Sequence, residues 1–314
     1  MPEAPSNRQA PRPATAFVLS GGASLGAIQA GMLRALFERG IEPDLVLGSS
    51  VGALNGAYIA SRPPTVETAR TLAAVWRGVR RSDIFPLNPL AGLAGFLGQR
   101  QSMLSARGLR RTIARHVELD RLEHASVPLH VIATDLFSGA ERRLSHGDAV
   151  SAIHASAAIP GVFKPVDWED TKLIDGGIAN NTPITHAIEL GAERIYVLPT
   201  GMACALSEPP RGALAMSLHA MSILVTRRLT HEIENLADRA ELIVLPPPCP
   251  LDVLPIDFSH AEELIDRGYE DARAYLEGVR PGEGPRVPFS LTAHSHRVEA
   301  PDAEVADEPS TPPR

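Results

Sequence analysis

The pattern with the clearest chemical potential is Gly48-Ser49-Ser50-Val51-Gly52, a G-x-S-x-G motif. It lies between a short apolar run and a helical stretch, the setting of a nucleophilic serine on a sharp strand-to-helix turn. The Val51 amide and the helix N-terminus can face negative charge that develops beside the Ser50 hydroxyl. Ser49 lacks a glycine two positions away on each side, so the motif favours Ser50. An ordinary turn with a capping serine fits the same letters, so a second element is needed.

A glycine-rich turn, GGASLG, occupies residues 21–26 upstream of the motif. It too follows an apolar run and opens a helical stretch, so a parallel βαβ unit would bring it to the same carboxyl edge as Ser50. Nucleotide binding is the alternative function, but Ala23 breaks G-x-G-x-x-G and no P-loop lysine follows. We therefore expect an oxyanion hole formed by the backbone amides of Gly21, Gly22, Ala23 and Val51.

A third element, Asp175-Gly176-Gly177, follows the apolar pair Leu173-Ile174. Its glycines leave the carboxylate uncrowded, so Asp175 is a candidate general base. Taken alone, an aspartate in such a turn more commonly faces solvent. The two elements upstream favour the catalytic interpretation.

Together these elements resemble the patatin-like phospholipase family. The resemblance rests on LSGGASLGAIQAGML, GSSVGALNGA and DGGIANNTP, with further similarity in ATDLFSG and SAAIPGVFKPV, and it spans roughly residues 17–198. Ala23 and Leu25 depart from the family pattern, which usually has a third glycine and a cation at these positions. The glycines that match the motifs are Gly26, Gly48, Gly52, Gly176 and Gly177.

The resemblance implies a lipid acyl-ester hydrolase of the phospholipase A, lysophospholipase or esterase type. In such an enzyme Ser50 is the nucleophile and Asp175 its base, without a cofactor or a metal. Two alternatives stay open: a catalytically silent patatin-fold binding protein, and a Ser-His-Asp α/β-hydrolase or acyltransferase. The second would need a histidine after Asp175, and the candidates are His219, His231 and His260.

The elements that would position these residues alternate between strand and helix. Apolar runs that precede glycine or turn residues predict strands at residues 16–20, 44–48, 129–134, 172–175, 194–199 and 241–245. Helical patterns cover residues 27–39, 51–61, 65–79, 106–116, 149–157, 185–190, 217–240 and 260–276. This alternation predicts an α/β fold: a mainly parallel sheet with helices on both faces, in three layers.

Composition predicts one folded domain over residues 15–280, flanked by a disordered arm (residues 1–14) and a disordered tail rich in proline and acidic residues (281–314). The two cysteines exclude a disulfide framework and a four-cysteine metal site. The chain shows no secretory signal and no membrane-spanning stretch, so we expect a cytoplasmic protein. The net charge of −7 argues against nucleic acid as a partner.

An arginine-rich segment contrasts with this acidic balance. Residues 70–121 hold ten arginines, although a bias towards arginine codons is the favoured explanation of their abundance. The apolar, proline-broken stretch 84–97 lies among them and is a candidate lid. We predict peripheral contact with an anionic membrane surface, through the lid and through Arg77, Arg80, Arg81, Arg107, Arg110 and Arg111.

Overall fold

The computed structural model describes residues 14–85, 102, 104–279, 287–294 and 296. Most of the candidate lid (84–97) and of the two predicted disordered ends lies outside the described residues. None of the described helices is both long and apolar enough to span a bilayer.

The core is one sheet with strand order β5-β6-β3-β2-β1-β7-β8, with β4 also pairing with β3. Neighbouring strands are parallel from β3 to β8, as expected, whereas β4 and β6 run antiparallel to β3, and β5 antiparallel to β6. The strands are β1 (Thr15–Leu19), β2 (Leu45–Ser49), β3 (Leu129–Asp135), β4 (Glu141–Leu144), β5 (Val166–Trp168), β6 (Thr171–Asp175), β7 (Arg194–Leu198) and β8 (Glu241–Val244).

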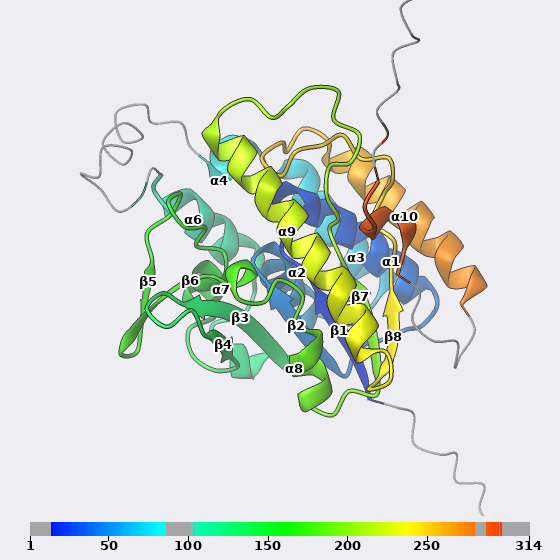
Figure 1. Ribbon diagram of the computed structural model, residues 1–314. Coiled ribbons are helices and arrows are strands. Elements are labelled where there is room, and N and C mark those ends of the chain that lie inside the picture. Colours follow the sequence, from blue (N-terminus) through cyan, green and yellow to red (C-terminus); the bar gives the residue numbers. More distant parts are fainter. Residues whose placement is uncertain (1–13, 86–101, 103, 280–286, 295, 297–314) are drawn as a thin grey trace, which may run out of the picture.

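Alternating side chains of the central strands build two hydrophobic cores. In β1, Phe17 and Leu19 face one core, while Ala16 and Val18 face the other. Helices α8 and α9 cover the second core, and α9 lies across the sheet in Figure 1. The remaining longer helices pack on the first, confirming the three-layer fold. The helices are α1 (Ala27–Glu38), α2 (Val51–Ala60), α3 (Val66–Gly78), α4 (Arg81–Ile84), α6 (Arg107–His116), α7 (Ala149–Ser156), α8 (Ile184–Glu189), α9 (Ala213–Leu236) and α10 (Ala261–Gly278).

Several short segments differ from the sequence-based expectation, among them helix α4 (Arg81–Ile84), which was not predicted. Strands β4 and β5 were not predicted, because their sequences ERRL and VDW lack an apolar run. Residues 287–294 lie within the tail that was expected to be disordered. There the segment VPFSL contains a 3₁₀ turn (Phe289–Leu291), and Leu291 is fully buried in the second core. This part of the tail is therefore part of the folded unit.

Candidate active site

Ser50 lies on a strained turn between β2 and α2. Its φ of 53° and ψ of −123° are rare for a residue with a side chain. Tight packing enforces this turn, since a Cβ on Gly48 would lie 2.3 Å from the Gly52 carbonyl oxygen, and one on Gly52 would lie 2.1 Å from that of Leu19. The G-x-S-x-G spacing is thus required by backbone contact.

Ser50 and Asp175 are in contact. The Ser50 hydroxyl donates to Oδ2 of Asp175 at 2.8 Å, and the Gly177 amide donates to Oδ1 at 2.8 Å. Burial raises the pKa of the Asp175 carboxyl to about 6, although the hydrogen bonds from Gly177 and Ser50 act to lower it. A carboxylate with a raised pKa is a stronger base than an ordinary aspartate.

The register of an antiparallel strand brings Asp175 to Ser50. In β3, Ile132 is paired with Ser49 of β2, and the next residue, Ala133, is paired with Asp175 of β6. Because Ser50 follows Ser49, Asp175 and Ser50 lie at the same level on either side of β3. If β6 ran parallel to β3, its last residue would instead lie towards the C-terminal end of β3.

The backbone N–H groups of the predicted oxyanion donors fall into two groups by their hydrogen bonds. Gly21 N–H donates to the Asn181 carbonyl at 3.3 Å, so Gly21 differs from the other three predicted oxyanion donors. Within the described part of the chain, the N–H groups of Gly22, Ala23 and Val51 have no acceptor. Thr200 stabilises the glycine turn, because its hydroxyl donates to the Gly21 carbonyl at 2.7 Å.

A buried polar chain that sequence reasoning missed supports the same turn. Trp76 Nε1 donates to Asn55 Oδ1 at 3.1 Å, and Asn55 Nδ2 donates to Gln29 Oε1 at 2.8 Å. Gln29 Nε2 donates in turn to the carbonyls of Ser20 and Leu198 at 2.9 and 2.8 Å. Gln29 and Asn55 are fully buried. The available signal was a single polar residue in each of two otherwise apolar helical segments, AIQAGML and VGALNGA.

Side chains also hold the backbone of both dyad residues in place. Ser156 accepts from the Ser50 amide at 2.8 Å, and Thr134 donates to the Asp175 carbonyl at 2.8 Å. Thr134 also accepts from the Ala179 amide at 3.1 Å. These contacts hold the backbone on which both reacting groups are carried.

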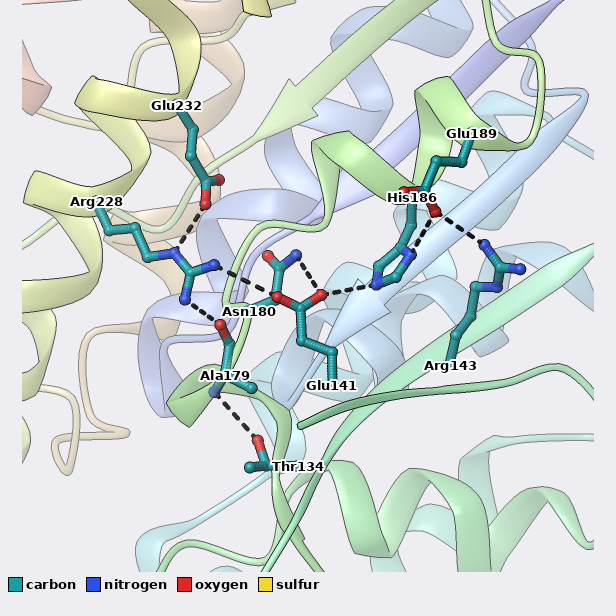
Figure 2. Close-up of polar contacts among 9 residues, drawn as sticks. All are labelled: Thr134, Glu141, Arg143, Ala179, Asn180, His186, Glu189, Arg228 and Glu232. Atoms are coloured by element: carbon teal, nitrogen blue, oxygen red, sulfur yellow. Dashed lines mark hydrogen bonds and ion pairs between the residues drawn. The ribbon is translucent and has the colours of Figure 1, made fainter. Parts of the chain in front are cut away.

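Figure 2 shows an ion-pair network around the turn that follows Asp175. Glu141 of β4 accepts from Asn180 of the turn at 3.0 Å and from His186 of α8 at 2.8 Å. Arg228 of α9 donates to the Ala179 carbonyl and contacts Glu141 and Glu232. The network ties β4, α8 and α9 to the turn.

None of the three candidate triad histidines contacts the dyad in the described part of the structure. The partners of the Asp175 carboxylate are Ser50 and Gly177. His231 and His260 form ion pairs with acidic residues that are close to them in the sequence. His219 lies on α9, and burial lowers its pKa. The geometry therefore gives no support to a Ser-His-Asp arrangement.

Ser50 lies where two pockets meet. The first, with an empty volume of about 650 Å³, is walled almost entirely by apolar side chains, among them Leu54, Trp76, Phe85, Leu109 and Phe163. The second, of about 530 Å³, contains Asp175, the glycine turn, Thr200 and residues of α9. Both include Ala23, Ser50 and Ile159. A molecule bound at Ser50 can thus extend in two directions, one of them apolar.

More than half of the chain is similar to known proteins of one family. The family model described as patatin-like phospholipase matches residues 17–188. Patatin-like phospholipase domain-containing protein 7 of Mus musculus is 31% identical over 190 residues, which are 60% of this chain and 14% of that protein. An uncharacterized NTE family protein of Mycobacterium bovis is 30% identical over 183 residues, 58% of this chain and 47% of that one. The chain thus matches less than half the length of each of these relatives.

Solved structures show more distant likeness. VipD from Legionella pneumophila superposes with a TM-score of 0.46 at 15% identity, over 85% of this chain and 67% of that one. Human GIVD cytosolic phospholipase A2 gives a TM-score of 0.40 at 11% identity, over 84% and 59% of the two chains. Because the family model covers more than half of the sequence, the chain belongs to the patatin-like phospholipase family.

Proposed function

We propose that this protein is a lipid acyl-ester hydrolase in which Ser50 is the nucleophile and Asp175 the general base. The observation that carries the proposal is the 2.8 Å hydrogen bond from the Ser50 hydroxyl to the buried Asp175 carboxylate. The pKa of Asp175, raised to about 6, leaves the carboxyl ionised at neutral pH and makes it a better proton acceptor than an ordinary aspartate.

In the first half-reaction, Asp175 accepts the Ser50 proton while Oγ attacks the ester carbonyl carbon. The carbonyl oxygen becomes an oxyanion, and the N–H groups of Gly22, Ala23 and Val51 are its donors. Each such donor is worth about 3–4 kcal/mol of transition-state stabilisation. Collapse of the intermediate returns the proton from Asp175 to the leaving alcohol and produces an acyl-enzyme. Water, deprotonated by Asp175, then releases the fatty acid and regenerates Ser50.

The substrate class follows from the apolar pocket. An acyl chain would lie among the apolar side chains of the first pocket, while the alcohol part of the ester would occupy the second. Names of relatives support lipid substrates: the Mycosarcoma maydis protein called lysophospholipase NTE1 is 27% identical over 193 residues, 59% of this chain and 10% of that one.

A fluorophosphonate probe tests the nucleophile. We expect covalent labelling of the wild type, none of Ser50→Ala, and labelling at the wild-type level in Ser49→Ala. Ser49 is the matched control because it is the adjacent serine, fully buried, with a hydroxyl that has no partner among the described residues. Labelling or ester hydrolysis by Ser50→Ala at the wild-type rate would contradict the proposal.

We further propose that α6 contacts an anionic lipid surface. Its inward side chains Leu109 and Ile113 are buried, whereas four arginines are exposed and have no ion-pair partner in the described structure: Arg107, Arg110, Arg111 and Arg115. Attraction of each arginine near an anionic membrane is worth about 1 kcal/mol. Arg77, by contrast, pairs with Glu262 at 2.7 Å and is less available for lipid.

Vesicle sedimentation tests this contact. Replacement of Arg107, Arg110 and Arg111 by glutamine should weaken binding to vesicles that contain phosphatidylserine and spare hydrolysis of a soluble short-chain ester. A control with the same change in charge replaces three exposed arginines on other segments, Arg70, Arg239 and Arg273. Equal loss of binding in both triple variants would show that overall charge, rather than α6, governs the association.

A further inference from the structure

A second cluster of reactive side chains lies where the loops after β7 and β8 meet the C-terminal strap, which we define as residues 287–294 and His296. It consists of Cys204, Cys249, His294 and His296, whose ligand atoms all lie within 4.8 Å of one another. The Cys249 sulfur is 3.2 Å from Nε2 of His294 and 3.1 Å from Nε2 of His296. None of the four lines either pocket at Ser50.

We propose that these four residues bind a structural zinc ion. Two thiolates and two imidazoles form a closed tetrahedral donor set that Zn²⁺ prefers. With Zn–S bonds of about 2.3 Å and Zn–N bonds of about 2.0–2.1 Å, tetrahedral geometry requires ligand atoms about 3.4–3.8 Å apart. The observed atoms reach that arrangement through side-chain adjustments of less than about 1 Å.

Hydrogen bonds orient the donors for such a site. His294 Nδ1 lies 3.1 Å from the Thr292 carbonyl, which can only accept, so Nδ1 carries the proton and Nε2 presents its lone pair towards Cys249. The Leu251 amide donates to the Cys204 sulfur at 3.3 Å, a contact that stabilises a thiolate. The Phe289 ring stacks on His294, with ring centroids 4.5 Å apart.

The backbone independently brings the three segments together. The amides of Cys204 and Ala205 donate to the Leu251 carbonyl at 2.8 and 2.9 Å, and the His296 amide donates to the Cys204 carbonyl at 3.3 Å. The two loops continue to the active site, where Gly201 and Pro255 line the second pocket. The ion would thus fasten the strap to loops that support the catalytic edge, and its role is structural.

The proposed site differs from the sequence-based expectation that the protein binds no metal. The sequence did not indicate the site, because the separations between Cys204, Cys249 and His294 are much longer than the short ligand spacings of zinc fingers. Only the approach of three distant segments creates the donor set.

Metal analysis of the full chain, purified in the presence of a reductant and without chelator, tests the proposal. We expect about one zinc per chain in the wild type and a loss of most of it in Cys249→Ser and in His296→Ala. His231→Ala is the matched control, because His231 is an exposed histidine on α9, and it should keep its zinc. Because Cys249→Ser could unfold, His296→Ala provides a second variant, at a side chain that is exposed. Fluorophosphonate labelling of Ser50 then checks that each variant is folded.

Cobalt substitution and proteolysis provide independent measurements. Co²⁺ added to the apoprotein should give the visible absorption of a tetrahedral thiolate site, lost in Cys249→Ser and removed by Zn²⁺. Chelation should speed proteolytic cleavage in the strap and leave the initial rate of ester hydrolysis unchanged. Wild-type protein without stoichiometric zinc and without a cobalt spectrum would overturn the proposal, as would full zinc in His296→Ala or a Cys204–Cys249 disulfide in the purified protein.

Discussion

Replacement of Asp175 by asparagine should stabilise the protein at neutral pH. Burial raises the pKa of this carboxyl from an ordinary 3.8 to about 6, so the folded state resists its ionisation. At neutral pH the Asp175 carboxyl is ionised in both the folded and the unfolded state. The folded wild type then bears the full free-energy cost of the buried charge. The difference between the two pKa values corresponds to about 3 kcal/mol, which is an upper limit for the gain in the free energy of unfolding. The neutral amide of the variant keeps an oxygen that accepts from the Gly177 N–H.

The pH dependence of the gain follows from the sign of this shift. Below pH 3.8 the carboxyl is protonated in both states, and the wild type and Asp175→Asn should differ little from this cause. As pH rises from 3.8 to about 6, the unfolded state loses its proton first, so wild-type stability falls. The advantage of Asp175→Asn should therefore grow through this interval and level off above about pH 6, at on the order of 6 °C in Tm.

Thermal melts of the two proteins from about pH 4.5 to about pH 8 measure this effect. Asp135→Asn is a control of opposite sign, because hydrogen bonds, first that from Thr171, lower the pKa of Asp135 to about 2. The stabilisation from Asp135 is present above pH 3.8 and lost only as pH falls towards about 2. Asp135→Asn should therefore be less stable than the wild type by a nearly constant amount over the measured range. An Asp175→Asn protein that is no more stable, or whose gain does not vary with pH, would refute the reasoning.

Three further outcomes are expected. In stopped assays on a soluble ester, kcat/KM should fall about tenfold per pH unit below a midpoint near pH 6, because protonated Asp175 cannot act as base; a midpoint near 4 would contradict its raised pKa. Gln29→Leu should cost about 1–3 kcal/mol in urea unfolding and lower kcat, since it removes the side-chain donor to the Ser20 carbonyl and one of the two donors to the Leu198 carbonyl; unchanged stability and rate would dismiss the buried polar chain as a support. Leu54→Trp, which fills the apolar pocket, should reduce hydrolysis of long-chain esters relative to short ones, whereas Leu224→Trp on the exposed face of α9 should not; equal effects on both chain lengths would remove that pocket as the acyl site.

The sequence alone was enough to predict the α/β architecture and the family. Apolar runs of four to six residues before glycine or turn residues identified the strands from β1 to β3 and from β6 to β8, because a strand that is buried on both faces needs apolar side chains on both. Local contacts also explain the nucleophile turn. The contact that excludes a Cβ at Gly48 lies within the turn and is encoded in the motif, whereas the one that excludes a Cβ at Gly52 is made with the Leu19 carbonyl of β1.

Features that depend on strand register or on distant segments could not be read from the sequence. The alignment of Asp175 with Ser50 depends on an antiparallel β6, while the sequence indicated only that a strand precedes the aspartate. The engagement of the Gly21 amide depends on Asn181, a residue from another part of the chain. The Cys and His cluster likewise requires two loops and the strap to meet. Pattern and spacing report local geometry along the chain, whereas hydrogen bonds and ligand sets between remote segments exist only once the sheet and its covering helices have packed.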